Sequence, residues 1–174
     1  VPQVIKRSIL FSVARENGCK VLVETGTYLG DTVGYALDCF EEVHSIEISE
    51  QLHERAQKIF ADRPNLHLYL GDSGDVLPTI LPSLKRPAVF WLDGHFSEHV
   101  TGRGVEDTPV LRELQALLRS DVDHVAVIDD ACEFGTNPAY PTLETVRDLV
   151  ASTRPAYQMI VLADLIVITP RRMG

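Results

Sequence analysis

The chain contains 174 residues, of which 45% are hydrophobic and 24% are charged. This length and composition are typical of a single folded domain spanning residues 1–174, and they exclude a disordered or fibrous protein. Its 25 Asp and Glu residues outnumber its 16 Lys and Arg residues, and the resulting net charge of −9 argues against nucleic acid or an anionic membrane as a partner.

Helical and strand-like patterns alternate along the chain. Helices are predicted at residues 3–17, 31–40, 49–60, 74–81, 108–118 and 142–152. Strands are predicted at residues 20–24, 43–48, 66–70, 88–92, 124–128, 157–162 and 165–169. Because strands that alternate with helices form parallel sheets covered on both faces, we expect an α/β protein with a Rossmann-like, mainly parallel sheet of about seven strands. The last two strands, joined at Ala163 and Asp164, are predicted to form a C-terminal antiparallel hairpin.

Local patterns also predict how some helices begin and pack. In the first helix, Ile5, Ile9 and Val13 share one face, which is expected to pack on the sheet. Ile59 is expected to point inward from the third helix. Thr108-Pro109 fits an N-cap residue followed by a first-turn proline, so the fifth helix is expected to begin there.

Cysteine usage and hydropathy indicate the compartment. Cys19, Cys39 and Cys132 form no CxxC pair, and their odd number excludes complete internal pairing. The longest apolar stretch, residues 159–168, is interrupted by Asp164 and is far too short to cross a bilayer. With no recognisable signal peptide, we expect a cytoplasmic protein with no membrane partner.

Acidic residues lie at the end of, or directly after, each of the five predicted parallel strands. They are Glu24, Glu47, Asp72, Asp93, Asp129 and Asp130. Ligands of open α/β sheets bind outside the carboxyl ends of the strands, so these carboxylates are expected to converge on the ligand edge. Helix capping and turn formation are the alternative explanation, especially for Asp72. However, like charges gathered at one edge repel each other unless a cation or a proton intervenes, which favours a positively charged ligand.

The first strand leads into a glycine-containing turn, Glu24-x-Gly26-x-x-x-Gly30. Glycines allow a tight turn and a close approach to a ligand. Tyr28 stands where a dinucleotide-binding fingerprint would have its middle glycine, which argues against an NAD dehydrogenase. Glu47 lies 21 residues beyond Gly26, at the end of the second strand, where an acid can hold the hydroxyl groups of a ribose.

Together with Gly71-Asp72-Ser73 and Asp93, these residues resemble the S-adenosylmethionine (SAM) site of class I methyltransferases. The resemblance extends over nearly the whole chain. It implies that Gly26 and Gly30 lie beside the methionine part of the cofactor and Glu24 near its amino group. It implies that Glu47 binds the ribose hydroxyls, that Asp72 accepts from the adenine amino group, and that Ser73 lies beside the ring. The resemblance also places Asp93, which follows the fourth strand, among the cofactor-binding residues.

Asp93, Asp129 and Asp130 resemble the metal ligands of catechol-type and macrocin-type (sugar) O-methyltransferases. In the catechol type the last of the three is Asn, whereas this chain has Asp130. Three carboxylates suit a hard divalent ion, and Mg²⁺ is the metal that we expect. Such an ion would orient an acceptor hydroxyl and lower its pKa. The alternative is that some of these acids only cap loops.

His95 is the candidate general base, and Asp93, two residues before it, is the other residue expected to take part in catalysis. His95 lies near the start of the long connection 94–106, and long connections are often lids or binding loops. Arg103 in the same segment could contact an acidic acceptor. The alternative is a solvent-exposed loop that contains an incidental histidine.

These observations predict a SAM-dependent O-methyltransferase that acts with a divalent metal on a small hydroxylated acceptor, either a sugar or a phenol or catechol. Since the chain has little beyond the core sheet, either the acceptor is small or a second subunit, as in a homo-oligomer, helps to enclose the site. One alternative is a metal-dependent hydrolase that uses Asp93, His95, His99 and Asp129. Another is a non-catalytic nucleoside-binding module.

Overall fold

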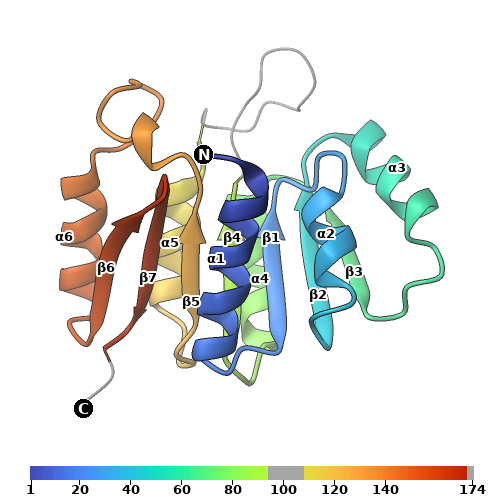
Figure 1. Ribbon diagram of the computed structural model, residues 1–174, viewed down its shortest axis with the longest axis horizontal. Helices are drawn as coiled ribbons and strands as arrows, with labels where there is room; N and C mark the ends of the chain where they lie inside the picture. The colour runs from blue at the N-terminus through green and yellow to red at the C-terminus, as the bar shows by residue number, and fades with distance from the viewer. Residues whose placement is uncertain (94–107, 172–174) are drawn as a thin grey trace.

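A computed structural model describes residues 1–93 and 108–171, which form one seven-stranded sheet with helices on both faces (Figure 1). The strand order is β3-β2-β1-β4-β5-β7-β6. The strands are β1 (Val21–Thr25), β2 (Glu42–Glu47), β3 (Leu66–Leu70), β4 (Ala88–Leu92), β5 (Val125–Ile128), β6 (Tyr157–Leu162) and β7 (Leu165–Pro170). Strands β1 to β5 are parallel, and β7 is antiparallel to both β5 and β6. The predicted fold class and the C-terminal hairpin are thereby confirmed.

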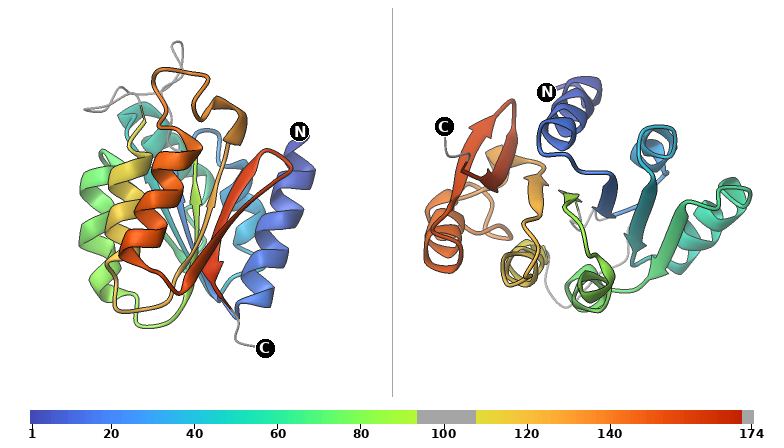
Figure 2. Two further views of the ribbon diagram at one scale, coloured as in Figure 1. Left: turned by 90° about the vertical axis from the view of Figure 1, so that its left-hand side faces the viewer. Right: turned by 90° about the horizontal axis from the view of Figure 1, so that it is seen from below.

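Six α-helices accompany the strands in the described part of the chain. They are α1 (Gln3–Glu16), α2 (Asp31–Ala36), α3 (Glu50–Ile59), α4 (Ser73–Ile80), α5 (Val110–Leu118) and α6 (Leu143–Thr153), with short 3₁₀ turns at Leu81–Ser83 and Ala131–Glu133. Helices α1 and α2 lie on one side of the sheet, and α4, α5 and α6 lie on the other (Figure 2). Among the described helices, none combines the length and the apolar character that a bilayer span requires.

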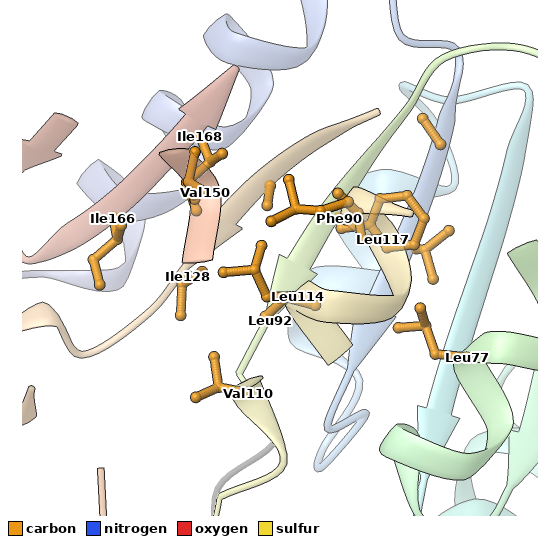
Figure 3. Packing of buried hydrophobic residues seen from close by; sticks show 14 of the residues in the cluster. Leu77, Phe90, Leu92, Val110, Leu114, Leu117, Ile128, Val150, Ile166 and Ile168 are labelled. Carbon is orange, nitrogen blue, oxygen red and sulfur yellow. The ribbon is translucent and has the colours of Figure 1, made fainter. Parts of the chain in front are cut away.

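The central strands are buried on both faces, and side chains that alternate along them enter two separate cores. Phe90 and Leu92 of β4 pack with α4, α5 and α6, where Leu114 is completely buried (Figure 3). Val89 and Trp91 of the same strand pack on the opposite face, against α1 and α2. This alternation explains why the strand reads as a continuous apolar run.

The predicted apolar face of helix α1 packs against the core only in part. The buried residues are Lys6, Leu10 and Ala14, whereas Ile5 is 45% exposed. Ile9 and Val13 are partly buried against the same core, so the prediction was wrong for Ile5 and missed the more deeply buried stripe beside it. The physical reason is that α1 packs beside β4 with its narrow stripe of Leu10 and Ala14, and Lys6 continues this stripe towards the carboxyl ends of the strands.

Three smaller differences from the predicted elements arise at helix ends. Helix α5 begins at Val110 with Pro109 in the N-cap position, so Thr108 is not the cap. Helix α2 ends at Ala36 and is shorter than predicted. Ile59 is 53% exposed, because α3 lies beside the edge strand β3, where less of the sheet is available to cover it.

The parallel arrangement brings the carboxyl ends of β1 to β5 to one edge of the sheet. Helix α1 begins at this same edge (Figure 1). Residues that follow different strands, and that lie far apart in the sequence, therefore become neighbours there. This edge is where ligands of such sheets bind.

Candidate functional site

Glu24 lies near the end of β1 and is only 2% exposed. Its Oε2 accepts a hydrogen bond of 2.7 Å from Ser45 Oγ, and Thr27 Oγ1 lies 2.6 Å from the same Ser45 hydroxyl. Burial raises the pKa of Glu24 to about 8, although the hydrogen bond from Ser45 acts in the opposite direction. The carboxylate form would therefore be stabilised by a positively charged ligand.

The turn after β1 brings the backbone into a conformation that favours glycine. Gly26 and Gly30 have φ angles of +86° and +83°, and Tyr28 between them has a φ of +50°. A Cβ atom on Gly30 would come within 2.7 Å of the ring of Phe60. The turn is therefore compact, and it requires glycine at Gly30 both for its backbone angles and for the space beside Phe60.

Glu47, at the end of β2, holds this turn in place. Its Oε2 accepts from the backbone N–H of Tyr28 at 2.8 Å, and its Oε1 accepts from the backbone N–H of Ser49 at 2.9 Å. The side chain is nearly completely buried. Because a carboxylate oxygen can accept more than one hydrogen bond, each oxygen retains capacity for a hydroxyl donor.

Asp72 and Ser73 begin α4, and residues of α5 contact both. Asp72 caps α4 by accepting from the backbone N–H of Gly74 at 2.9 Å, and it forms an ion pair of 2.8 Å with Arg112 Nη2. Ser73 is hydrogen-bonded to the buried Glu113, whose pKa burial raises to about 7. Sequence reasoning missed both Arg112 and Glu113.

Asp93, Asp129 and Asp130 follow β4 and β5. The backbone N–H of Asp93 donates to the backbone oxygen of Thr25 at 3.3 Å, which ties the end of β4 to the end of β1. Burial raises the pKa of Asp129, and the charge of Asp93 raises it further. Asp129, Asp130 and Asp164 form a tight acidic group, in which one oxygen of each lies within 4.8 Å of the others.

Lys6 occupies this acidic group, and sequence reasoning did not find it. Its Nζ lies 2.5 Å from Asp129 Oδ1, 3.1 Å from Asp164 Oδ2 and 3.3 Å from Asp130 Oδ1. Its side chain is only 4% exposed. Burial by itself would lower the pKa of Lys6, but the hydrogen bonds and charges of these carboxylates raise it above its usual value. Lys6 is therefore a charged, buried ammonium at the carboxyl edge.

A small cavity lies beside the acidic group. Asp93, Glu113, Asp129 and Tyr140 are among the residues that line it. Its volume of about 10 Å³ corresponds to roughly one water position. Tyr140 packs edge-on against Phe134 at 5.2 Å between ring centres, and burial raises the pKa of its hydroxyl. The phenol of Tyr140 is therefore a neutral group at the wall of this cavity.

The structure thus brings Glu24, Gly26, Gly30 and Glu47 together around one turn, and Asp72 and Ser73 together at the start of α4. It brings Asp129 and Asp130 together around Lys6. His95, His99 and Arg103 lie outside the described residues. The roles of these residues in binding or catalysis stay predictions.

No protein-family model matches the sequence, and no curated protein matches it either. Solved structures do resemble the fold. An O-methyltransferase from Bacillus cereus in complex with SAH has a TM-score of 0.65 and 15% identity, over 98% of this chain and 82% of that one. The O-methyltransferase TomG from Streptomyces achromogenes, in complex with SAM, has a TM-score of 0.62 and 18% identity, over 98% and 80%. The 23S rRNA methyltransferase ErmE has a TM-score of 0.57 and 14% identity, over 95% and 68%.

At these identities the likeness concerns the fold alone. The chain has the α/β fold of SAM-dependent methyltransferases, as the resemblance of its motifs predicts. The similar structures include TomG, which is involved in tomaymycin synthesis, and ErmE, which is named as a 23S rRNA methyltransferase. The fold therefore leaves the type of acceptor open.

Proposed function

We propose that the chain is a SAM-dependent O-methyltransferase that acts on a small hydroxylated acceptor. The observation that carries the proposal is the pair of buried carboxylates, Glu24 and Glu47, on either side of the Gly26–Gly30 turn. Two buried carboxylates at the ligand edge suit a molecule that offers both a positive group and hydroxyl donors. SAM offers its amino group and sulfonium as positive groups, and its ribose as the donor.

Each part of the cofactor has a proposed partner. Glu24 would pair with the amino group, and Gly26 and Gly30 would let the backbone lie against the methionine part. Glu47 would accept from the ribose hydroxyls. Asp72 would accept from the adenine amino group, with Ser73 beside the ring.

The methyl group on a sulfonium is already activated, so the protein's part is to position an acceptor oxygen and take its proton. In the transfer, the bond from carbon to sulfur breaks while the bond from carbon to the acceptor oxygen forms, and the hydroxyl proton leaves. His95 is the proposed base for that proton, with Asp93 beside the reacting centre. The proposed acceptor is a sugar or a phenol or catechol.

A divalent metal at Asp93, Asp129 and Asp130 was predicted from the sequence, but the described side chains fit it poorly. Asp129 and Asp130 already face the ammonium of Lys6. Asp93 lies outside the tight acidic group, whose third member is Asp164. The metal therefore stays a prediction, and no step of the transfer is assigned to it.

The cofactor proposal is tested by calorimetry with S-adenosylhomocysteine (SAH), the product of the transfer. We expect the wild type to bind SAH and Glu47→Ala to lose at least about tenfold in affinity, the typical effect of removing a charged hydrogen-bond partner. Glu54→Ala is the matched control, because Glu54 is an exposed acid whose side-chain partner is Lys58 of the same helix.

The possible results separate the proposal from its two alternatives. A wild type that does not bind SAH, or a Glu47→Ala variant that binds like the wild type, would reject the cofactor site. Tight zinc without SAH binding would favour the hydrolase. SAH binding without methyl transfer from SAM to any hydroxylated acceptor would favour the nucleoside-binding module.

A further inference from the structure

Several carboxylate oxygens of the acidic group already accept hydrogen bonds from the protein. Asp129 Oδ1 accepts from Lys6 Nζ at 2.5 Å and from the backbone N–H of Asp130 at 2.7 Å. Asp164 Oδ2 faces Lys6 at 3.1 Å, while its Oδ1 accepts from the backbone N–H of Cys132 at 2.9 Å. Asp129 Oδ1 therefore has both of its lone pairs in use.

The ammonium also joins three parts of the fold. Lys6 comes from the first helix, Asp129 and Asp130 follow β5, and Asp164 lies in the turn between β6 and β7. Asp130 and Asp164 have φ angles of +55° and +66°, so two of the three carboxylates lie on backbone that turns sharply at this point. The backbone N–H of Ala131 also donates to the backbone oxygen of Asp164 at 3.0 Å, which links the loop after β5 to the hairpin turn.

Size and charge make the ammonium and a divalent ion mutually exclusive here. Carboxylate oxygens bind Mg²⁺ or Mn²⁺ at about 2.1 Å. Since Nζ of Lys6 lies within 3.3 Å of an oxygen from each of the three acids, an ion held by the same oxygens would occupy the space of the ammonium. Two positive charges so close together in a buried site repel each other strongly.

We propose that Lys6 is the resident cation of the acidic edge, and that it takes the place of a divalent metal there. It acts as a positioning residue, because it holds Asp129 and Asp130 in one arrangement through its ammonium. Its importance for methyl transfer rests on the proposed function, whereas its competition with metal ions does not. The wild type should therefore need no divalent ion, and loss of the ammonium should leave three carboxylates able to bind one.

The test is a titration with Mn²⁺, followed by electron paramagnetic resonance, of the wild type and of Lys6→Met. Met retains the apolar stem of the side chain but removes the charge. We expect the wild type to bind no Mn²⁺ at this edge and Lys6→Met to bind one ion, with a melting temperature that rises when Mn²⁺ is added. Lys58→Met is the matched control, because Lys58 is 80% exposed, and it should behave like the wild type.

A further substitution assigns any binding to the acidic edge. Asp129→Asn, made in the Lys6→Met background, should abolish the gained binding. It should leave untouched any metal held by Glu42, His44 and His67, a separate group near the amino ends of β2 and β3. Lys6→Arg preserves the positive charge and should exclude Mn²⁺ as the wild type does.

Two results would overturn the proposal. One is a wild type that binds Mn²⁺ at a site lost in Asp129→Asn. The other is a folded Lys6→Met variant that gains no binding. If Lys6→Met fails to fold without metal, the wild-type and Lys6→Arg titrations still decide the question. Calorimetry with SAH on the same preparations tests the cofactor proposal separately, so the two failures are distinguishable.

Discussion

The negative charges of three buried carboxylates at the carboxyl edge of the sheet are stabilised in three different ways. Asp129 faces the ammonium of Lys6, and Glu47 accepts one backbone N–H at each oxygen. The hydrogen bonds that Glu24 receives from described side chains come from the hydroxyl groups of Ser45 and Thr32. A buried carboxylate without a countercharge is costly in its ionised form. Glu24 is therefore the group whose ionisation a positively charged ligand would change most.

Cofactor affinity should accordingly fall as the pH is lowered through the pKa of Glu24. Burial raises that pKa to about 8, so below it the free carboxyl is neutral and must lose a proton before it can pair with an amino group. Between about pH 8 and pH 6 we expect SAH affinity to fall by up to about tenfold per pH unit. Calorimetry should also show proton release on binding.

Glu24→Gln is the control for this prediction, because it removes the titrating group at nearly constant size. Its affinity should be lower than that of the wild type and should vary little over the same pH range. A wild type whose affinity for SAH is the same at both ends of that range would contradict the proposed pairing of Glu24 with the cofactor.

Lys6 and Glu113 are buried charged residues that sequence reasoning missed, and the sequence gives a sign of burial for only one of them. Lys6 was missed because a lysine in an amphipathic helix usually extends into solvent, and its burial depends on carboxylates more than 120 residues away. Glu113 lies on the apolar stripe of α5, with Val110, Leu114 and Leu117. Helical periodicity alone could therefore have placed Glu113 in the interior.

At the level of elements, the strands could be predicted well, because their apolar residues either form continuous runs, as in β4, or alternate with polar ones, as in β3. The predicted strand at 88–92 agrees with β4, and that at 66–70 agrees with β3. The buried face of a helix was harder to predict, because in α1 the stripe beside the predicted apolar one also packs against the sheet. The burial of Lys6 on α1 follows from its contacts with Asp129 and Asp164, which exist only in the tertiary structure.

The turn before α2 and the helix itself contain a matched pair of glycines. Gly30 has a φ of +83° and faces Phe60. Gly34 lies within the helix, where an added Cβ atom would have no neighbour within 4 Å. Gly30→Ala should lower the free energy of unfolding by at least about 1–2 kcal/mol, because a side chain in the left-handed region is strained and its Cβ would also crowd the ring of Phe60. Gly34→Ala should raise it by about 0.5–1 kcal/mol, because alanine is the better helix former.

Urea denaturation of the two variants beside the wild type measures both effects. The opposite signs are the important feature, since each substitution adds the same methyl group within a few residues of the other. Equal changes for the two variants would show that neither the backbone conformation nor the contact with Phe60 distinguishes these positions.

For the whole molecule, the alternation of strands and helices is enough to predict a parallel sheet and its ligand edge. The order of the strands is not, because it depends on which strands pair across long connections. In the structure β1 lies between β2 and β4, and this placement brings the end of β1 next to both Glu47 and Asp93. The sequence thus predicts that the acids share one edge, but not that they form separate groups around Glu24 and Lys6.

The acidity of the whole chain bears on the type of acceptor, which the fold leaves open between small molecules and RNA. RNA binding draws most of its affinity from basic side chains that displace counterions from phosphates. A net charge of −9 repels a polyanion instead, and six of the acids stand at the proposed site itself. We therefore expect no saturable binding of a fluorescent RNA hairpin at about 0.15 M salt, measured by anisotropy. We also expect no methyl transfer from SAM to RNA under conditions in which a hydroxylated small molecule is methylated. Salt-sensitive RNA binding, together with transfer to RNA, would instead place the chain with the RNA-directed enzymes of this fold.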